Sequence, residues 1–163
     1  MGEDKVPTIH ASAVLFGARA ALIRGPAGAG KSRLVLALLE AARVGVLPFA
    51  RLVADDRAHA AAVNGRLLVR PADKLAGLLE VRGLGLRRLP FEPVAVVGLV
   101  VDLHAADAER LPLEATRTTV VDGISLPRLA VAPGLDPLPR VLAFLTTTEV
   151  ELWESADKTG VLP

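Results

Sequence analysis

The 163-residue chain contains no cysteine and no tyrosine, and aromatic residues make up only 3% of it. The absence of cysteine excludes disulfide bonds, thiolate metal ligands and cysteine nucleophiles. The shortage of aromatic side chains predicts a core of alanine, valine and leucine, which a hydrophobic fraction of 52% supplies in quantity. A composition this apolar also excludes an intrinsically disordered chain.

Neither sign of charge is in excess, because 19 Lys and Arg stand against 18 Asp and Glu, for a net charge of +1. This balance gives no bulk electrostatic reason to expect nucleic acid as a partner. The first residues, Met1–Lys5, lack the apolar core of a signal peptide. The longest aliphatic run, Val94–Val101, contains Gly98 and has about half the length that a membrane span needs. We therefore expect a soluble, cytoplasmic protein with no membrane partner, folded as a single domain over residues 1–163.

Hydrophobic periodicity and turn residues predict an α/β chain without internal repeats or linkers. Strands are expected over residues 9–16, 20–24, 51–54, 60–63, 66–69, 94–103, 116–121 and 124–131, and helical segments from Lys31 to about Gly45, over 73–79 and over 137–152. The dipeptides Asn64-Gly65 and Asp122-Gly123 lie between apolar runs, which indicates tight hairpins. The near-continuous apolarity of 94–103 predicts a strand buried on both faces. Residues 83–86 form a backbone-permissive stretch, and 105–112 is expected to be a loop or an irregular helix.

The most informative motif lies between the second expected strand and the first expected helix. It consists of Gly25, Pro26, Ala27, Gly28, Ala29, Gly30, Lys31 and Ser32. This run matches the phosphate-binding pattern G-x-x-x-x-G-K-[ST] at every position. The glycines allow backbone N–H groups to point at phosphate oxygens, and the following helix adds its positive end. Lys31 is expected to reach the β- and γ-phosphates and Ser32 to bind Mg²⁺, so the motif predicts a nucleoside triphosphate bound with Mg²⁺.

The strand that enters this loop is the second arm of an expected hairpin. An antiparallel neighbour is unusual for an ordinary doubly wound nucleotide-binding sheet, whose strands are parallel. The hairpin therefore predicts a mixed sheet.

A magnesium-dependent phosphate loop also needs a carboxylate at the end of a nearby strand. Two expected strands end in aspartate, one at Asp55-Asp56 and the other at Asp102, and spacing alone does not separate them. Neighbouring residues of an extended chain point to opposite sides, so only one of Asp55 and Asp56 is expected to face the phosphates. On spacing alone, Glu80 is a surface acid near a glycine turn, and His10 is a hydrogen-bonded structural residue of its strand.

Together these pieces resemble the catalytic domain of bacterial HPr kinase/phosphorylase. The resemblance runs from His10 to about Pro133. It is carried by His10, the loop from Gly25 to Ser32, the run Arg51-Leu-Val-Ala-Asp-Asp56 and the run Glu80-Val-Arg-Gly-Leu-Gly85. The two runs are much more specific to the family than the phosphate loop. Arg110 and the segment Ile124-Ser-Leu-Pro-Arg128 are similar to further family positions, and the length is similar to short members that lack the N-terminal domain.

The resemblance implies an α/β fold that contains a P-loop and is similar to phosphoenolpyruvate carboxykinase, with a mixed central sheet and flanking helices. It implies an ATP-dependent serine protein kinase whose acceptor is HPr, the phosphocarrier of the sugar phosphotransferase system. The family also runs a phosphate-dependent phosphorylase reaction that releases pyrophosphate, and its members are commonly hexamers, which implies a homo-oligomer.

The same resemblance implies roles for individual residues. Lys31 contacts phosphate, and Ser32 and Glu80 bind Mg²⁺. Asp56 is the general base, with Asp55 beside it. His10 and Arg110 complete the catalytic set.

The chain departs from the family in the segment tied to the phosphorylase reaction. Where the family has Gly-Arg-Asn, this chain has Gly134, Leu135 and Asp136. Leucine offers no cationic fork for inorganic phosphate. The kinase direction is therefore expected to survive better than the phosphorylase direction, unless Arg128 or Arg140 supplies the cation.

Two other classes of function remain open on the residues alone. A P-loop kinase for a small metabolite needs cationic side chains for its substrate, and Arg82, Arg87 and Arg88 are available. A nucleotide-sensing regulatory module without turnover is the other alternative, although the combination of Lys31 with the Asp55-Asp56 pair argues against it. Transfer of labelled phosphate from ATP to candidate phosphocarriers separates all three.

Overall fold

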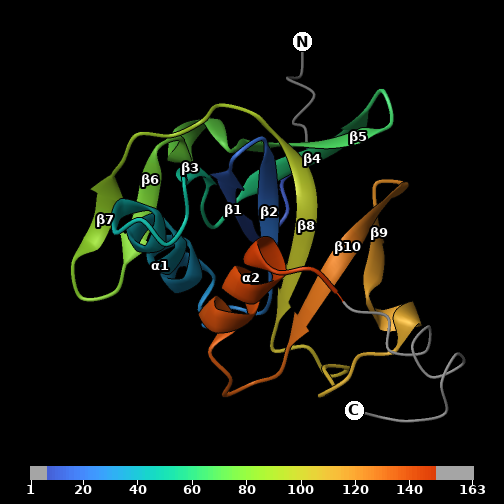
Figure 1. Ribbon diagram of the computed structural model, residues 1–163. Helices are drawn as coiled ribbons and strands as arrows, with labels where there is room; N and C mark the ends of the chain where they lie inside the picture. Colours follow the sequence, from blue (N-terminus) through green and yellow to red (C-terminus); the bar gives the residue numbers. More distant parts are fainter. Residues whose placement is uncertain (1–6, 150–163) are drawn as a thin grey trace, which may run out of the picture.

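The computed structural model describes residues 7–149 as a mixed β-sheet with helices on one face (Figure 1). The strands are β1 Ala11–Phe16, β2 Arg19–Arg24, β3 Arg51–Ala54, β4 Ala58–Val63, β5 Arg66–Pro71, β6 Leu78–Val81, β7 Gly85–Arg88, β8 Ala95–Leu103, β9 Thr118–Val121 and β10 Ile124–Val131. The α-helices are α1 Lys31–Arg43 and α2 Pro137–Thr146, and the short 3₁₀ turns are η1 Asp73–Leu75 and η2 Glu114–Thr116.

The main sheet has the strand order β3-β1-β2-β8-β10-β9, and the β4–β5 hairpin joins it where β5 pairs with β8. Strands β2, β8 and β10 are parallel, whereas β1 is antiparallel to both β2 and β3. β3 therefore runs in the same direction as β2, so the carboxyl ends of β2, β3, β8 and β10 share one edge. The amino end of β1 lies at this edge too. The mixed sheet expected from the hairpin before the phosphate loop is confirmed.

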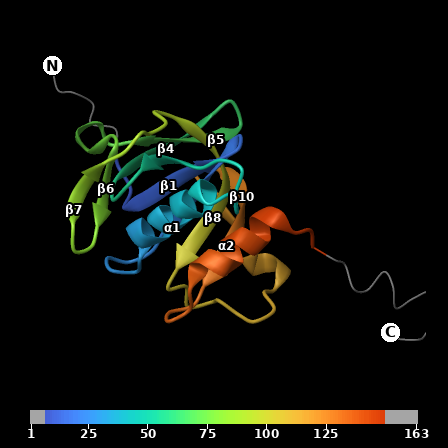
Figure 2. The ribbon, with the colours of Figure 1, turned by 60° about the vertical axis from the view of Figure 1, so that its left-hand side comes forward.

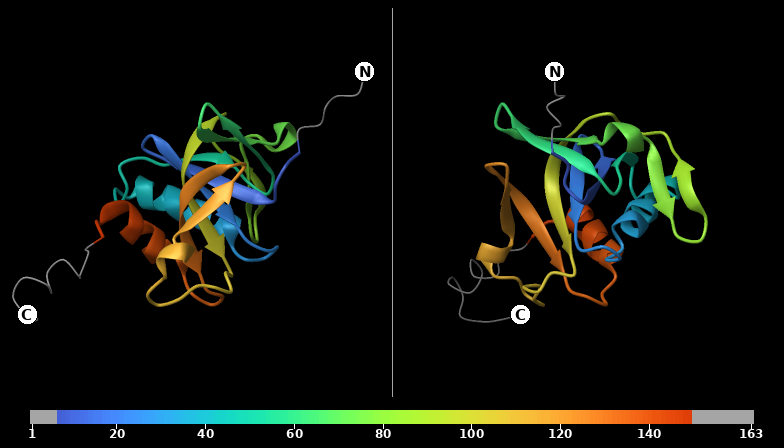
Figure 3. Two further views of the ribbon diagram at one scale, coloured as in Figure 1. Left: turned by 90° about the vertical axis from the view of Figure 1, so that its right-hand side faces the viewer. Right: turned by 180° about the vertical axis from the view of Figure 1, so that it is seen from behind.

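The two faces of the sheet bury two separate apolar cores. On β2, Ile23 belongs to the core under the helices and Leu22 to the core under the β4–β5 hairpin. On β8, Val101 belongs to the core under the helices and Val100 to the core under the hairpin. The expectation that this strand is buried on both faces is therefore confirmed. Figures 2 and 3 show α1 and α2 on one side of the sheet and the β4–β5 hairpin on the other. Buried aliphatic residues are alanine, valine and leucine almost throughout, with Ile23 as the exception among the described residues.

Helix α1 follows the phosphate loop directly and buries one stripe of its surface. Leu34, Leu38 and Ala41 recur at helical spacing and are buried against the sheet. The helix ends at Arg43, and Gly45 then takes a φ of 83°, which glycine adopts without a steric penalty. Burial of this stripe fixes the first turn of α1 at the carboxyl edge of β2.

Local turn chemistry is confirmed at both predicted hairpins. Asn64 and Gly65 have φ of 50° and 74°, and Asp122 and Gly123 have φ of 46° and 77°. Two consecutive positive φ values are what a tight hairpin turn requires. These turns join β4 to β5 and β9 to β10.

Other segments differ from the expectation. The helical turn expected over 73–79 is only η1, since β6 begins at Leu78. Residues 105–112, by contrast, form a loop, which is one of the two alternatives expected for them. The stretch 83–86 belongs to a hairpin that ends in β7, which periodicity does not reveal because all four residues of β7 are exposed. The last helix, expected over 137–152, ends at Thr146, and residues 147–149 are not helical; the expected end, Leu152, lies outside the described residues. No helix in the part of the chain that the structure describes is long and apolar enough to cross a membrane.

Candidate active site

The phosphate loop connects the end of β2 to the start of α1. Gly25, Gly28 and Gly30 have φ of 155°, 79° and 96°, all in the region that favours glycine. Gly25 is also tightly packed, because a Cβ there would lie 3.1 Å from both the side chain and the carbonyl oxygen of Leu103. The backbone path of the loop thus depends on glycine and rests against the end of β8.

Lys31 is the first residue of α1, and its side chain lies against the loop. Lys31 is only 6% exposed, and its Nζ donates to the carbonyl oxygens of Gly25 at 2.8 Å and Pro26 at 3.0 Å. Burial lowers the pKa of this ammonium, and the negative charges of Asp56 and Asp55 oppose the shift. An ammonium has three N–H donors, so one remains for a phosphate oxygen.

Asp55 is the carboxylate that the structure brings to the phosphate loop. It directly follows β3 and is 3% exposed. Ser32 Oγ lies 2.8 Å from its Oδ1 and 2.9 Å from its Oδ2, and the hydroxyl donates to this carboxylate. Ser12 Oγ of β1 donates to Oδ1 at 2.7 Å, and the backbone N–H of Glu80 donates to Oδ2 at 3.1 Å. The donors that hold this buried carboxylate, among the described residues, are therefore hydroxyl and amide groups.

The donor set around Ser32 suits a hard divalent cation. The Ser32 hydroxyl donates its hydrogen bond to Asp55, so the lone pairs of the Ser32 oxygen remain available to a metal. Asp55 adds negative charge directly behind that oxygen. In proteins, Mg²⁺ is usually bound by only one or two protein oxygens, and substrate phosphates and water molecules supply the other ligands. Within residues 7–149 no three or more His, Cys, Asp or Glu side chains are grouped so that they could hold a metal ion. The Ser32 hydroxyl and the charge of Asp55 fit a cation that is shared with a nucleotide.

Asp56 points away from Asp55 and pairs with His10. Its backbone has a φ of 63°, a left-handed conformation that aspartate tolerates better than most residues. His10 Nε2 lies 3.1 Å from Asp56 Oδ1, and the two side chains are 38% and 61% exposed. His10 precedes β1, and the antiparallel direction of β1 carries it to the edge where β3 ends. The site therefore contains one buried and one accessible carboxylate in adjacent positions.

Asp102, the other aspartate near a strand end, belongs to a different network. It lies between Arg24 of β2 and Arg128 of β10. Arg24 donates to both carboxylate oxygens at 2.7 Å and 2.8 Å, and Arg128 Nε donates to Oδ2 at 2.6 Å. Burial acts to raise the pKa of Asp102, but the hydrogen bonds from Arg24 and Arg128 outweigh it and the pKa lies below its ordinary value. Of the two aspartates that spacing does not separate, Asp55 contacts Ser32 and Asp102 contacts two arginines.

Arg128 extends this network to the segment after β8. Its Nη1 and Nη2 donate to the two carboxylate oxygens of Asp107 at 2.7 Å and 2.9 Å. With Asp102 and Asp107 both bound, the Arg128 side chain is 13% exposed. Arg128 therefore has little left to offer a free anion.

The side chains of Glu80 and Arg110 make no hydrogen bond or ion pair with the other predicted site residues that the structure describes. The backbone of Glu80 touches Asp55, but its side chain is exposed. Arg110 is exposed in the segment between β8 and η2 and makes no hydrogen bond or ion pair with another described residue. The structure thus brings together His10, Lys31, Ser32, Asp55 and Asp56, and shows no polar contact between the Arg110 side chain and any of them.

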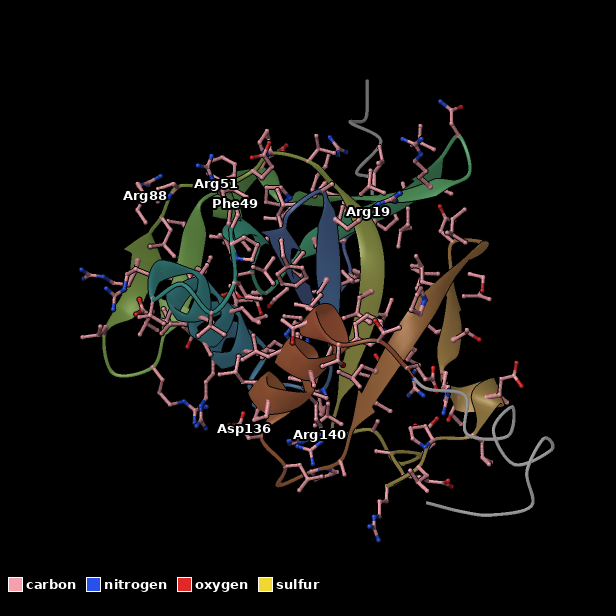
Figure 4. The ribbon with its side chains drawn as sticks, viewed as in Figure 1. Arg19, Phe49, Arg51, Arg88, Asp136 and Arg140 are labelled. Atoms are coloured by element: carbon pink, nitrogen blue, oxygen red, sulfur yellow. The ribbon has the colours of Figure 1, made fainter. Side chains whose placement is uncertain are left out.

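The segment from Gly134 to Asp136 leads into α2. Asp136 caps this helix, since its Oδ1 accepts from the N–H of Leu138 at 3.0 Å. Arg140 Nη1 donates to the carbonyl oxygen of Asp136 at 2.9 Å. Figure 4 shows Asp136 and Arg140 together at the lower end of the molecule, and Phe49 and Arg51 at the opposite end. Leu135 is 49% exposed and supplies no polar group.

Three residues that take part in these hydrogen-bond networks were not predicted to do so from the sequence. Ser12, Arg24 and the pairing role of Arg128 each depend on which strands are neighbours. The available signal was a single polar residue in an otherwise apolar strand for Ser12. For Arg24 it was an arginine at the end of the strand that leads into the loop.

Comparison with known proteins locates the fold. No family model matches the sequence, and neither does any curated protein. Among solved structures, the chain is similar to the HPr(Ser) kinase/phosphatase from Coxiella burnetii, with a TM-score of 0.67 and 23% sequence identity, over 85% of this chain and 88% of that chain. The fold that the sequence motifs implied is thereby confirmed: the chain has the mixed α/β fold of an HPr(Ser) kinase/phosphatase.

Proposed function

We propose that the chain is an ATP-dependent kinase that phosphorylates a serine of an HPr-type phosphocarrier protein. The observation that carries the proposal is the hydrogen bond of Ser32 to the buried Asp55, beside the accessible pair of Asp56 and His10. The first pair suits a metal-bound nucleotide, and the second suits an acceptor hydroxyl that arrives from solvent. The similarity in fold to an HPr(Ser) kinase/phosphatase supports this choice of acceptor.

In this proposal the residues of the loop bind and orient the nucleotide. The loop N–H groups and the positive end of α1 hold the phosphates. Lys31 keeps its hydrogen bonds to the loop carbonyls and donates its remaining N–H to a phosphate oxygen. Ser32 and Glu80 would hold Mg²⁺, and Asp55 accepts the hydrogen bond of the Ser32 hydroxyl on the side away from the metal. When bound, Mg²⁺ neutralises part of the charge on the phosphate oxygens.

The accessible carboxylate carries the acid–base step. The acceptor serine oxygen forms its bond to the γ-phosphorus as its proton passes to Asp56. The bond from the γ-phosphorus to the bridging oxygen breaks, and ADP leaves. His10, 3.1 Å from Asp56, orients that carboxylate, and Arg110 adds positive charge once the acceptor is bound. A positioned base of this kind contributes about 10²–10⁴-fold in rate.

The test is a transfer assay with the purified chain, Mg²⁺, γ-labelled ATP and an HPr-type phosphocarrier. We expect label on one serine of the carrier, and none when that serine is replaced by alanine. Labelling of small molecules but not of the carrier would instead identify a metabolite kinase. Binding of ATP without any turnover would identify a regulatory module, and either result would overturn the proposal.

A further inference from the structure

We propose that Ser12 is a positioning residue for Asp55. Its buried hydroxyl holds the carboxylate in the orientation that keeps Ser32 ready for a metal ion. This inference rests on the proposed function, because it assumes that Ser32 binds the metal of a metal–nucleotide complex.

The burial of Ser12 sets it apart from other polar residues. Among residues 7–149 the buried polar or charged residues are Ser12, Lys31 and Asp55. Lys31 and Asp55 are site residues that the sequence motifs predict, whereas the third, Ser12, is fully buried in β1 between Ala11 and Ala13 and belongs to no motif. A hydroxyl buried in an apolar strand is costly unless it is hydrogen-bonded. Its partner here is Asp55 Oδ1, at 2.7 Å.

The hydrogen bonds to Asp55 come from three different elements. Ser12 of β1 donates to Oδ1, the backbone N–H of Glu80 in β6 donates to Oδ2, and Ser32 of α1 lies within hydrogen-bond distance of both oxygens. Ser12 and Glu80 thus restrain one oxygen each, and the Ser32 hydroxyl is left to bond to a carboxylate that cannot turn. The Glu80 contact is made by the backbone, so Ser12 is the side chain through which this restraint can be removed without altering Ser32.

The consequence concerns the metal and not the nucleotide alone. A fixed Asp55 keeps the Ser32 proton on the carboxylate side and the Ser32 lone pairs on the opposite side, where the cation would lie. The loop amides and Lys31 contact phosphate without help from Asp55. Loss of the Ser12 hydroxyl is therefore expected to weaken the metal-dependent part of nucleotide binding and to spare the rest.

Calorimetry on the full chain measures these two parts separately. The Kd for ATP is determined once with Mg²⁺ and once with EDTA. The Kd in EDTA divided by the Kd with Mg²⁺ is the ratio that reports the contribution of the metal. We expect Ser12→Ala to reduce this ratio by about 10-fold, the loss typical when an outer-shell partner of a metal ligand is removed. The Kd in EDTA should stay within about twofold of the wild-type value, and Ser12→Thr, which keeps the hydroxyl, should restore the ratio.

Val14→Ala is the matched control. Val14 is fully buried in the same strand but packs in the core under the helices, away from Asp55. We expect this variant to lose stability and to keep the wild-type ratio. If Ser12→Ala does not fold, Ser12→Cys, which weakens the donor at similar volume, takes its place under the same criteria.

The outcomes distinguish this inference from the proposed function. A wild-type chain whose affinity for ATP does not respond to Mg²⁺ overturns the proposed function. A responsive wild type with an unchanged ratio in Ser12→Ala overturns the role of Ser12 alone. An equal loss of ratio in Val14→Ala also overturns it, because general loosening of β1 would then be the cause.

Discussion

Asp55 and Asp102 lie at the carboxyl ends of two strands on the same edge of the sheet, yet their surroundings are opposite. Asp55 accepts hydrogen bonds from two serine hydroxyls and one backbone amide, whereas Asp102 is bound by two guanidinium groups. Neutral donors stabilise a carboxylate without cancelling its charge, so Asp55 keeps a negative charge that is available to a cation at Ser32. The charge of Asp102 is compensated by Arg24 and Arg128. The different partners of the two carboxylates are the reason that we propose Asp55 for the metal–nucleotide site and Asp102 for the stability of the fold.

The largest expected effect is on the Asp55 side of this comparison. We expect Lys31→Ala to reduce phosphoryl transfer by at least about 10³-fold, because it removes the ammonium that stabilises charge on the transferring group. Initial rates with labelled ATP measure the loss. Arg33→Ala is the control, since Arg33 is an exposed cation two positions along the same helix. Full transfer activity in the Lys31 variant would exclude the phosphate loop as the site.

The next largest effect is expected at Asp102, where substitution should change the stability of the fold. We expect Asp102→Asn to lower the free energy of unfolding by about 3 kcal/mol, because it leaves two partly buried arginines without their shared counter-charge. Urea unfolding at neutral pH measures the change, and the affinity of the folded variant for ATP should equal that of the wild type. Asp107→Asn, which removes an exposed partner of Arg128, should cost less. A stable Asp102 variant that has lost nucleotide binding would reverse the assignment.

Asp56→Asn separates the accessible carboxylate from the buried one. We expect transfer to fall by about 10²-fold with little change in the Kd for ATP, because a general base acts on the acceptor hydroxyl. Glu80→Gln should instead change the Mg²⁺ concentration at half-maximal rate. If Asp56→Asn changed only the Mg²⁺ dependence, the two roles would have to be exchanged.

The Asp102 network also predicts a pH dependence of stability. The pKa of Asp102 is lower in the folded chain than its ordinary value, so the folded state favours the ionised form. The resulting stability is present above the ordinary aspartate pKa of about 3.9 and is lost as the pH falls through the lower folded pKa. The difference in unfolding free energy between wild type and Asp102→Asn should therefore be constant from pH 7 to about 5 and narrow below about pH 4. A gap that widens on acidification would contradict the ion pair.

The smallest expected effect concerns the direction of the reaction. Arg128 is committed to Asp102 and Asp107, and Arg140 is hydrogen-bonded to the Asp136 backbone, so neither is free to replace the family arginine that is absent at Leu135. We expect release of pyrophosphate from a phosphoserine carrier and inorganic phosphate to be slower than ATP-dependent phosphorylation. Leu135→Arg should raise the rate of pyrophosphate release. Equal rates in the two directions for the wild type would show that the missing arginine is not needed.

The features that the sequence could predict are local ones. The glycine-rich loop between β2 and α1 and both Asn-Gly and Asp-Gly hairpins depend on residues that are neighbours in the chain, and each has the backbone conformation that the sequence predicts. The hairpin before Gly25 even predicted the antiparallel neighbour of β2. Strand β7 was missed because its residues are all exposed and leave no apolar pattern.

The features that could not be predicted depend on strand order. Asp55 and Asp102 have the same local pattern, and only the pairing of β8 between β2 and β10 shows that Asp102 is bound by arginines. Ser12 reaches Asp55 across 43 positions of sequence, through the pairing of β1 with β3. The side-chain partners that distinguish the two acids are therefore tertiary contacts.

The most direct test of this distinction uses Mn²⁺ in place of Mg²⁺, because both favour oxygen ligands. The electron paramagnetic resonance spectrum of Mn²⁺ with ATP is titrated with wild type, Asp55→Asn and Asp102→Asn, at a temperature where circular dichroism shows all three folded. We predict that wild type and Asp102→Asn bind the metal–nucleotide complex with the same affinity and that Asp55→Asn binds it about 10-fold more weakly or worse. Wild-type affinity in Asp55→Asn together with a loss in Asp102→Asn would contradict the account.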